Sequence, residues 1–278
     1  MAATTNLSGK VAVITGGGGV LGACFAKAMA QAGAAVAILD INETAAETVA
    51  QTIRDEGGTA LVIAANVLDR TSLEAAYVKI LEDLGSCDIL INGAGGNNPR
   101  GTTDDEYFDP TREGLRTFFD LDPEGIRFVF DLNCIGVLLT TQVFAKGMIG
   151  RPGACIINVS SMNAYRPLTK IPAYSGAKAA VSNLTQWMAV YFAKAGIRVN
   201  ALAPGFFVSN QNHALLFDPE GNPTPRAEKI LRGTPMGRFG RPDELLGTLF
   251  WLLDDAVAGF VTGIIVPVDG GFSAYSGV

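Results

Sequence analysis

Two residues four positions apart, Tyr174 and Lys178, could together perform proton transfer. On a helix this spacing places both side chains on one face. A tyrosine ordinarily titrates near pH ~10, too high for easy acid–base work at neutral pH, and a neighbouring ammonium favours the phenolate. The pair therefore predicts a tyrosine that serves as general acid or base. The alternative is a surface helix on which the pair occurs by chance.

A serine upstream of this pair could act on the same substrate atom. Residues 156–159 are an apolar run that predicts a buried strand, and two hydroxyls follow it, Ser160 and Ser161. A hydroxyl at that point can hydrogen-bond the substrate oxygen that Tyr174 protonates. We therefore expect Ser161 to work together with Tyr174 and Lys178.

A glycine-rich turn near the N-terminus is placed to bind phosphate groups. A β-branched run over residues 10–15 predicts a buried strand, and a helical pattern covers residues 23–32. Residues 16–22 between them read Gly-Gly-Gly-Gly-Val-Leu-Gly. In a strand–turn–helix unit, such glycines let the backbone approach a pyrophosphate, and the helix N-terminus supplies N–H donors. The stretch therefore predicts a dinucleotide site.

Asp40 follows the second predicted strand, residues 35–39, at about the distance from the glycine turn where a carboxylate contacts the adenosine ribose. A carboxylate there accepts hydrogen bonds from the ribose hydroxyls and repels a 2′-phosphate. Neither Gly17 nor Ile41 is basic, so we expect NAD rather than NADP. The alternative is that Asp40 caps the next helix, a role that Asn42 could fill instead.

Strand and helix patterns alternate along the rest of the chain. This rhythm predicts an α/β fold, a Rossmann-type three-layer sandwich built on a doubly wound, seven-stranded parallel sheet. Because no internal repeat or interdomain linker is visible, we expect residues 1–278 to form a single domain. Further strands are predicted at residues 60–64, 88–91, 154–159, 198–202 and 263–268, and further helices at 43–56, 71–84, 125–148, 173–194 and 242–254.

Two irregular segments interrupt this rhythm. Residues 96–123, rich in Asn, Thr, Asp, Gly and Pro, follow a strand's carboxyl end, where such folds bind ligands; the alternative is an exposed decoration. Residues 209–232 are polar and Pro-rich in the middle, so we expect a mobile lid. Asn133 lies on an otherwise apolar helix face. A buried amide needs partners, so Asn133 is either structural or part of the site.

Composition narrows the class of protein. The net charge is −6 and no basic patch is visible, which argues against nucleic acid as a partner. The single histidine, His213, excludes a His-rich metal site, and we expect no metal. Four scattered cysteines in apolar runs predict buried free thiols in a reducing compartment. We see no signal-peptide pattern and no stretch approaching the ~20 apolar residues that span a bilayer, so we expect a cytoplasmic protein without a membrane partner.

Together these residues resemble the short-chain dehydrogenase/reductase family, across essentially the whole chain. The matching pieces include the glycine turn, Asp40, the Asn-Gly-Ala-Gly of residues 92–95, and the set Ser161, Tyr174 and Lys178. The resemblance implies that Tyr174 is the proton donor or acceptor and that Ser161 orients the substrate oxygen. It also implies that Lys178 lowers the pKa of Tyr174 and binds the nicotinamide ribose.

The resemblance extends to a fourth catalytic residue and to the cofactor. It implies that Asn133 holds a water in the proton relay, and that NAD is held by residues of the glycine turn, of the strand ends and of the segment after the sixth strand. Val20, Asn66 and Gly93 depart from the family's usual residues, and Gly18 or Gly19 could make the close approach in place of residue 20. The implied cofactor set is Gly16, Gly18, Gly19, Val20, Leu21, Asp40, Ile41, Asn66, Val67, Asn92, Gly93, Ala94, Tyr174, Lys178, Pro204, Gly205, Phe207 and Ser209.

Within the family, residues 16–22, 95–99, 163–174 and 269–278 resemble the D-mannonate oxidoreductase (fructuronate reductase) subgroup. A sugar acid needs a cation for its carboxylate and amides or hydroxyls for its polyol. Among the cations we rank Lys170 first, followed by Arg100 and Arg166. The candidate substrate residues are Gly96, Asn97, Asn98, Arg100, Ser161, Asn163, Arg166, Lys170, Asn210 and Gln211.

The sequence therefore predicts an NAD-dependent oxidoreductase acting on the alcohol or ketone of a sugar acid. One rival is a reductase or dehydrogenase of another polyol, sugar or oxoacyl substrate, although an acyl-carrier partner would favour a basic rim that this acidic chain lacks. A second rival is a regulator that binds NAD without turnover, which would not need the complete Ser161, Tyr174 and Lys178 set. Family resemblance and the apolar helices at 173–194 and 242–254 also predict a homotetramer.

Overall fold

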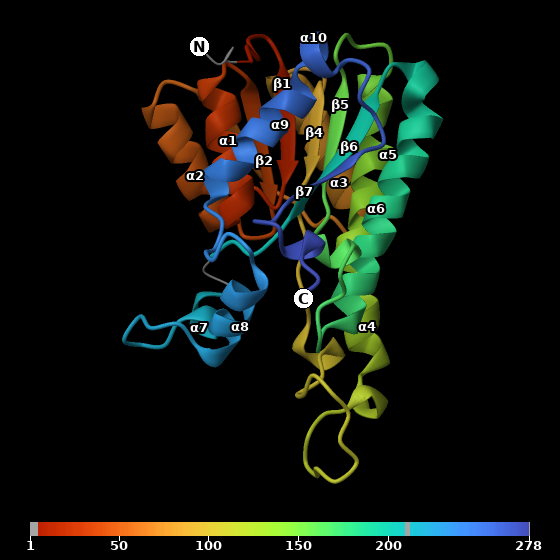
Figure 1. The fold of residues 1–278 in the computed structure, drawn as a ribbon. Helices are drawn as coiled ribbons and strands as arrows, with labels where there is room; N and C mark the ends of the chain where they lie inside the picture. Colours follow the sequence, from red (N-terminus) through yellow and green to blue (C-terminus); the bar gives the residue numbers. More distant parts are fainter. Residues whose placement is uncertain (1–4, 209–211, 278) are drawn as a thin grey trace.

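The computed structural model describes residues 5–208 and 212–277 and is built around one seven-stranded sheet (Figure 1). The strand order is β3-β2-β1-β4-β5-β6-β7, and every neighbouring pair is parallel. The predicted doubly wound parallel sheet is thus confirmed. The strands are β1 (Val11–Thr15), β2 (Ala35–Asp40), β3 (Thr59–Ala64), β4 (Ile89–Asn92), β5 (Cys155–Val159), β6 (Arg198–Pro204) and β7 (Ile265–Val268).

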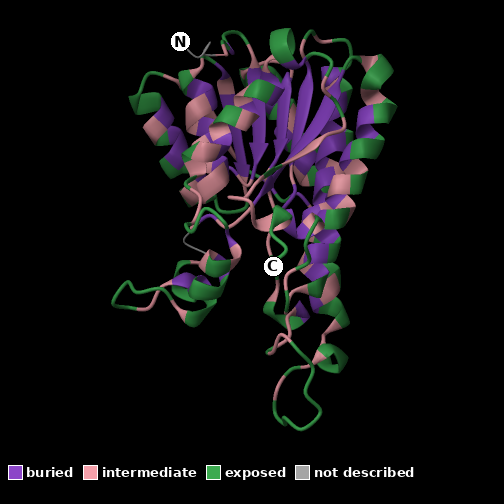
Figure 2. Cartoon of the chain, viewed as in Figure 1, coloured by how far each residue is buried: buried purple, intermediate pink, exposed green. Residues whose placement is uncertain are grey.

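Helices cover both faces of the sheet, so that the buried strands lie in the middle layer (Figure 2). One face carries α1 (Val20–Gln31), α2 (Glu43–Asp55) and α9 (Leu246–Leu253). The opposite face carries α3 (Arg70–Asp83), α5 (Gly136–Met148) and α6 (Pro172–Phe192). The remaining helices are α4 (Pro123–Phe130), α7 (His213–Leu216), α8 (Pro225–Gly233) and α10 (Asp255–Ala258).

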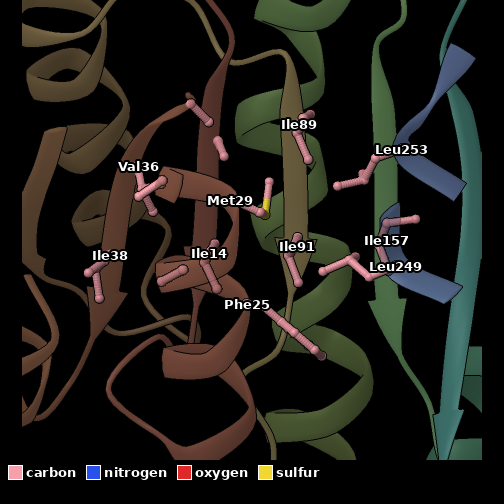
Figure 3. Close-up of a cluster of buried hydrophobic side chains, with 14 of the residues drawn as sticks. Ile14, Phe25, Met29, Val36, Ile38, Ile89, Ile91, Ile157, Leu249 and Leu253 are labelled. Atoms are coloured by element: carbon pink, nitrogen blue, oxygen red, sulfur yellow. The ribbon is translucent and has the colours of Figure 1, made fainter. Parts of the chain in front are cut away.

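The strands divide their side chains between two hydrophobic cores, as the two-residue period of a strand requires. In β4, Ile89 and Ile91 join the core beneath α1 and α9, whereas Leu90 joins the core beneath α3 and α5. The first of these cores contains Phe25 of α1 and Leu249 of α9 (Figure 3). Burial on both faces explains why the strands read as nearly continuous apolar runs.

The helix predicted over residues 125–148 is interrupted. α4 ends at Phe130, a π-helical turn spans Asp131–Ile135, and α5 begins at Gly136. Single π turns inside α-helices often occur at functional sites. Here the turn contains Asn133, which is fully buried.

The helical stretch Pro123–Met148 corrects the expectation that no stretch of this chain approaches the length and apolar composition of a membrane span. Its 26 residues are long and apolar enough to cross a membrane by length and composition alone. Half of the apolar window is buried, and Val137, Phe144 and Met148 pack in the core beneath α5. Packing against the sheet accounts for the apolar composition.

The carboxyl ends of β1 and β4 form the switch point of the sheet, because the chain leaves β1 for one face and β4 for the other. Their following segments touch: a Cβ on Gly16 would lie 2.9 Å from the backbone of Ala94. Open α/β sheets bind ligands at this point. The fold therefore brings the glycine turn and the residues after β4 to one place.

Candidate active site

Tyr174 and Lys178 lie one turn apart in the first part of α6, as their spacing predicts. The Nζ of Lys178 is 5.6 Å from the centroid of the Tyr174 ring. Lys178 is buried, and its Nζ donates a hydrogen bond of 2.8 Å to the carbonyl oxygen of Val159. The end of β5 thus anchors the ammonium, and burial lowers the pKa of Lys178 to about 8.

The pKa of Tyr174 differs from the sequence prediction. Burial raises the pKa of Tyr174 to about 12, and a hydrogen bond with the Ser161 side chain opposes this rise. The expected lowering by Lys178 is not found: desolvation of the phenol dominates the shift, and the Ser161 side chain is the group that opposes it. The phenol therefore stays protonated at neutral pH.

Ser161 is positioned by the turn that follows β5. It is the N-cap residue of a short 3-10 helix, Met162–Ala164, and its Oγ accepts a hydrogen bond of 3.2 Å from the backbone N–H of Asn163. This bond occupies one lone pair of the hydroxyl. The Ser161 hydrogen and the second lone pair can then serve Tyr174 and a substrate oxygen.

Asn133 is held by backbone groups on three sides. Its Nδ2 donates to the carbonyl oxygens of Gly96 and Val129, each at 2.7 Å, and its Oδ1 accepts from the N–H of Gly96 at 3.2 Å. The amide thereby ties the π turn to the loop after β4. These contacts give Asn133 a structural role, while the water-holding role in the site stays a prediction.

Gly95 is a site residue that the sequence analysis did not assign. A Cβ at this position would lie 2.7 Å from Asn133 Oδ1 and 3.2 Å from Lys178 Nζ. The loop backbone therefore lies directly against two of the four predicted catalytic residues. The signal was present in the Asn-Gly-Ala-Gly motif, but only the fold shows which glycine makes this contact.

The dinucleotide cradle has the form that its sequence predicts. Gly19 is the N-cap of α1 and has no side chain to cap the first N–H groups, so these are available to an anion. Val20 and Leu21 form the first helical positions. A Cβ on Gly22 would lie 2.8 Å from the Cα of Gly17, so this glycine lets α1 pack closely on the turn.

Asp40 ends β2 beside this cradle. Its Oδ2 accepts a hydrogen bond of 3.0 Å from the N–H of Gly18, and its Oδ1 accepts one of 2.9 Å from the N–H of Asn42. The N-cap of α2 is Asn42, which accepts from the N–H of Ala45, so the helix-capping alternative for Asp40 does not hold. The carboxylate keeps lone pairs for the hydroxyls of a ribose.

Asn92 uses its side chain inside the protein. It is buried, and its Nδ2 donates to Thr141 Oγ1 at 3.1 Å and to Asn158 Oδ1 at 2.8 Å. Its Oδ1 is buried without a partner among the residues that the structure describes. Gly93 is closely packed, because a Cβ there would lie 2.7 Å from the carbonyl oxygen of Thr15.

The other predicted cofactor residues surround the same edge of the sheet. Ile41 and Asn66 are exposed, whereas Val67 is buried, and Gly205 donates to the carbonyl oxygen of Val268. Pro204 ends β6 and the Phe207 ring packs against Gly240. Phe207 lines a cavity of about 370 Å³ that the catalytic residues do not line. Ser209 lies outside the described residues.

The predicted substrate cations are less available than the sequence suggests. Arg100 is ion-paired with Asp122, its Nε donating at 2.6 Å. Lys170 donates from Nζ to the backbone carbonyl oxygen of Asp104 at 2.6 Å. Arg166 is exposed on the segment between Ser161 and α6. The first-ranked and second-ranked cations are therefore engaged by the protein itself.

The remaining substrate candidates lie on the two loops. Asn97 donates to Thr102 Oγ1, and Asn98 caps a short 3-10 helix, Pro99–Gly101. Asn163 is buried next to Ser161, with its Oδ1 unpartnered among the residues that the structure describes. Asn210 and Gln211 lie outside the described part of the chain. Over residues 5–208 and 212–277, no group of His, Cys, Asp and Glu side chains could hold a metal ion.

Comparison with known proteins agrees with this geometry. The profile of the short chain dehydrogenase family matches residues 10–218. The chain therefore belongs to the short-chain dehydrogenase/reductase family and is an oxidoreductase.

Individual relatives cover nearly the full length of the chain. An uncharacterized oxidoreductase of Haemophilus influenzae (strain ATCC 51907 / DSM 11121 / KW20 / Rd) is 61% identical over 100% of this chain and 98% of its own. The uncharacterized oxidoreductase UxuB of Bacillus subtilis (strain 168) is 54% identical over 98% of each chain. A crystal structure from Haemophilus influenzae, described as a candidate D-mannonate oxidoreductase with bound NAD, superposes with a TM-score of 0.96 at 60% identity, covering 100% of this chain and 99% of that one.

The contact of Gly95 with Asn133 and Lys178 leads to a test by substitution. Gly95→Ala should lower kcat/KM by at least ~tenfold, because the new methyl group displaces the Asn133 amide or the Lys178 ammonium. The matched control is Gly247→Ala in α9, where nothing lies within 4 Å of the added Cβ. Steady-state kinetics and thermal unfolding of both variants check the prediction. Wild-type kinetics in a folded Gly95→Ala variant would contradict it.

Proposed function

We propose that this protein is an NAD-dependent oxidoreductase that moves a hydride between nicotinamide and the hydroxyl or keto carbon of a sugar acid, of the D-mannonate and D-fructuronate type. The proposal depends mainly on one observation. Tyr174, next to the Ser161 side chain, and Lys178 lie at the carboxyl edge of the sheet that also carries the glycine turn and Asp40. A proton donor beside a dinucleotide cradle is what carbonyl reduction requires.

The residues of the cradle fit NAD. The uncapped N-terminus of α1 suits the pyrophosphate, and the Asp40 carboxylate, fixed by the N–H of Gly18, suits the ribose hydroxyls. When bound, the nicotinamide supplies or accepts the hydride. The bound NAD in the similar Haemophilus influenzae structure supports the same choice.

The chain's own residues handle the proton. With a pKa of about 12, the Tyr174 phenol is protonated at neutral pH and can give its proton to a carbonyl oxygen when the substrate is reduced. Ser161 holds that oxygen through its hydroxyl hydrogen. Lys178, with a pKa of about 8, carries its charge below that pH and so supports the phenolate that proton transfer leaves behind.

The main support for a sugar acid as substrate comes from similar proteins. Support from a free cation that could bind the substrate carboxylate is weaker. The similar solved structure is described as a candidate D-mannonate oxidoreductase, and a gluconate 5-dehydrogenase from Burkholderia cenocepacia, in complex with NADP and tartrate, superposes with a TM-score of 0.83 at 33% identity, covering 98% of each chain. Within this chain, Arg100 and Lys170 are already bonded. This engagement favours one second candidate, a neutral polyol or sugar as substrate.

We further propose that the protein is a cytoplasmic homotetramer. On α6, Trp187, Val190 and Tyr191 are 57%, 80% and 65% exposed, which is unusual for large apolar residues and suits contact with another copy. A monomer mass from light scattering at micromolar concentration would exclude the tetramer.

The four cysteines are free, although Cys24 and Cys134 are only half-buried rather than buried as predicted.

The reaction is tested with a substrate panel. We expect NADH formation with NAD and D-mannonate, and NADH consumption with D-fructuronate, at rates well above those with D-mannitol.

Tyr174→Phe should lower kcat by ~10²–10⁴-fold while NADH affinity stays within about twofold, because only the proton donor is lost. Tyr77→Phe, on α3 and away from the site and from the proposed contact between copies, is the control. In the substrate panel, faster turnover of the neutral polyol D-mannitol than of D-mannonate would favour the second candidate, a neutral polyol or sugar as substrate.

The cofactor preference is tested at Asp40. We expect kcat/KM with NAD to exceed that with NADP by at least ~100-fold, because the carboxylate faces the position of a 2′-phosphate. Asp40→Ser should narrow this ratio by raising activity with NADP and lowering it with NAD. Asp55→Ser, at the end of the following helix, is the control. Equal use of both cofactors by the wild type would refute the assigned role of Asp40.

A further inference from the structure

Lys170 has an unusual backbone conformation at a sensitive place. Its φ is +72°, and it is the non-glycine residue with a positive φ in the part of the chain that the structure describes. Side chains with a Cβ rarely adopt this conformation, and where they do, the surrounding contacts hold them there. Lys170 stands two residues before Pro172, the first residue of the catalytic helix α6.

Two groups of Lys170 bind neighbouring residues of the loop at 96–123. Its carbonyl oxygen accepts a hydrogen bond of 2.9 Å from the N–H of Thr103. Its Nζ donates one of 2.6 Å to the carbonyl oxygen of Asp104. One residue thus fastens this loop both through its backbone and through its side chain.

The bonded part of the loop is itself fixed to the rest of the loop. Asp104 donates from its N–H to the carbonyl oxygen of Arg116 at 2.9 Å, and its Oδ2 accepts from the N–H of Arg116 at 2.6 Å. Arg116 in turn donates to the carbonyl oxygen of Pro99. Fixing Thr103 and Asp104 therefore fixes both limbs of the loop.

The same stretch also contacts the predicted lid. Glu106 forms an ion pair of 2.7 Å with Lys229 of α8. Its hydrogen bond with Lys229, and further the charges of Lys170 and Arg226, lower the pKa of the Glu106 carboxyl. Lys170, the loop and α8 therefore form one connected set of polar contacts.

We propose that Lys170 is a positioning residue, which holds the loop at 96–123 in a fixed position relative to the start of α6. The substrate contacts of the loop then keep a fixed distance and orientation relative to the phenol of Tyr174. This role replaces the direct contact with a substrate carboxylate that the sequence suggested. It deepens the proposed function and depends on it only for the kinetic readout. The two bonds to the loop stabilise the positive φ of Lys170.

Hydrogen exchange provides the primary test, because it needs no substrate. In Lys170→Met, we expect the amides of residues 103–116 to exchange at least ~tenfold faster than in the wild type, while NADH affinity stays within about twofold. Lys194→Met, an exposed lysine beyond the other end of α6, should leave the exchange unchanged. Unchanged loop exchange in Lys170→Met would overturn the proposal, whatever happens to KM.

A second variant separates the side chain from the backbone. Lys170→Gly keeps the carbonyl that Thr103 binds and suits a positive φ, but it lacks the Nζ. We expect fast loop exchange in this variant as well, together with a Tm above that of Lys170→Met by about 2–4 °C. Slow exchange in Lys170→Gly would show that the Nζ contributes nothing to holding the loop.

Kinetics then distinguish positioning from direct binding. A positioning role predicts a rise of KM for D-mannonate of about tenfold in Lys170→Met, accompanied by the faster loop exchange and partly rescued in Lys170→Arg. A rise of KM with unchanged loop exchange would identify a carboxylate ligand and contradict positioning. If no sugar acid is turned over by the wild type, the proposed function fails, while the exchange result still decides the role of Lys170.

Discussion

The site depends on how closely the loop after β4 can approach its neighbours. The backbone at Gly95 lies against Asn133 and Lys178, with no space for a Cβ, and the backbone at Gly93 lies against the carbonyl of Thr15. The Asn133 amide holds the loop in this position, because its Nδ2 donates to the carbonyl oxygen of Gly96 and its Oδ1 accepts from the N–H of Gly96. The close contact therefore limits the space beside the Lys178 ammonium, which the carbonyl oxygen of Val159 anchors.

A buried polar network beneath the site keeps the contributing elements in place. Asn92 of β4 bonds Asn158 of β5 and Thr141 of α5, and Asn158 bonds Thr185 of α6. Because breaking such bonds in a dry core is costly, they favour one relative position of the strands and helices, although the Oδ1 of Asn92 has no partner among the described residues. The catalytic helix α6 is thus coupled to β4 and β5. The loop with Gly93 and Gly95 follows β4, and Ser161 follows β5.

Burial sets the charge states that the site begins with. It raises the pKa of Tyr174 and lowers that of Lys178, so both groups are shifted toward their neutral forms. The hydrogen bond between Tyr174 and Ser161 opposes the first of these shifts. Desolvation, more than the pairing of Tyr174 with Lys178, therefore explains why the pKa of the phenol lies above its ordinary value.

The sequence by itself determined the fold class, the strand–turn–helix cradle and the grouping of Ser161, Tyr174 and Lys178, because apolar periodicity and short spacings are local properties. It could not determine what distant segments do to one another. Only the tertiary structure showed that Asn92 is used in the core, that Gly95 contacts two predicted catalytic residues, and that Lys170 binds the loop. These results depend on packing between segments far apart in the chain, which set burial, free volume and hydrogen-bond partners.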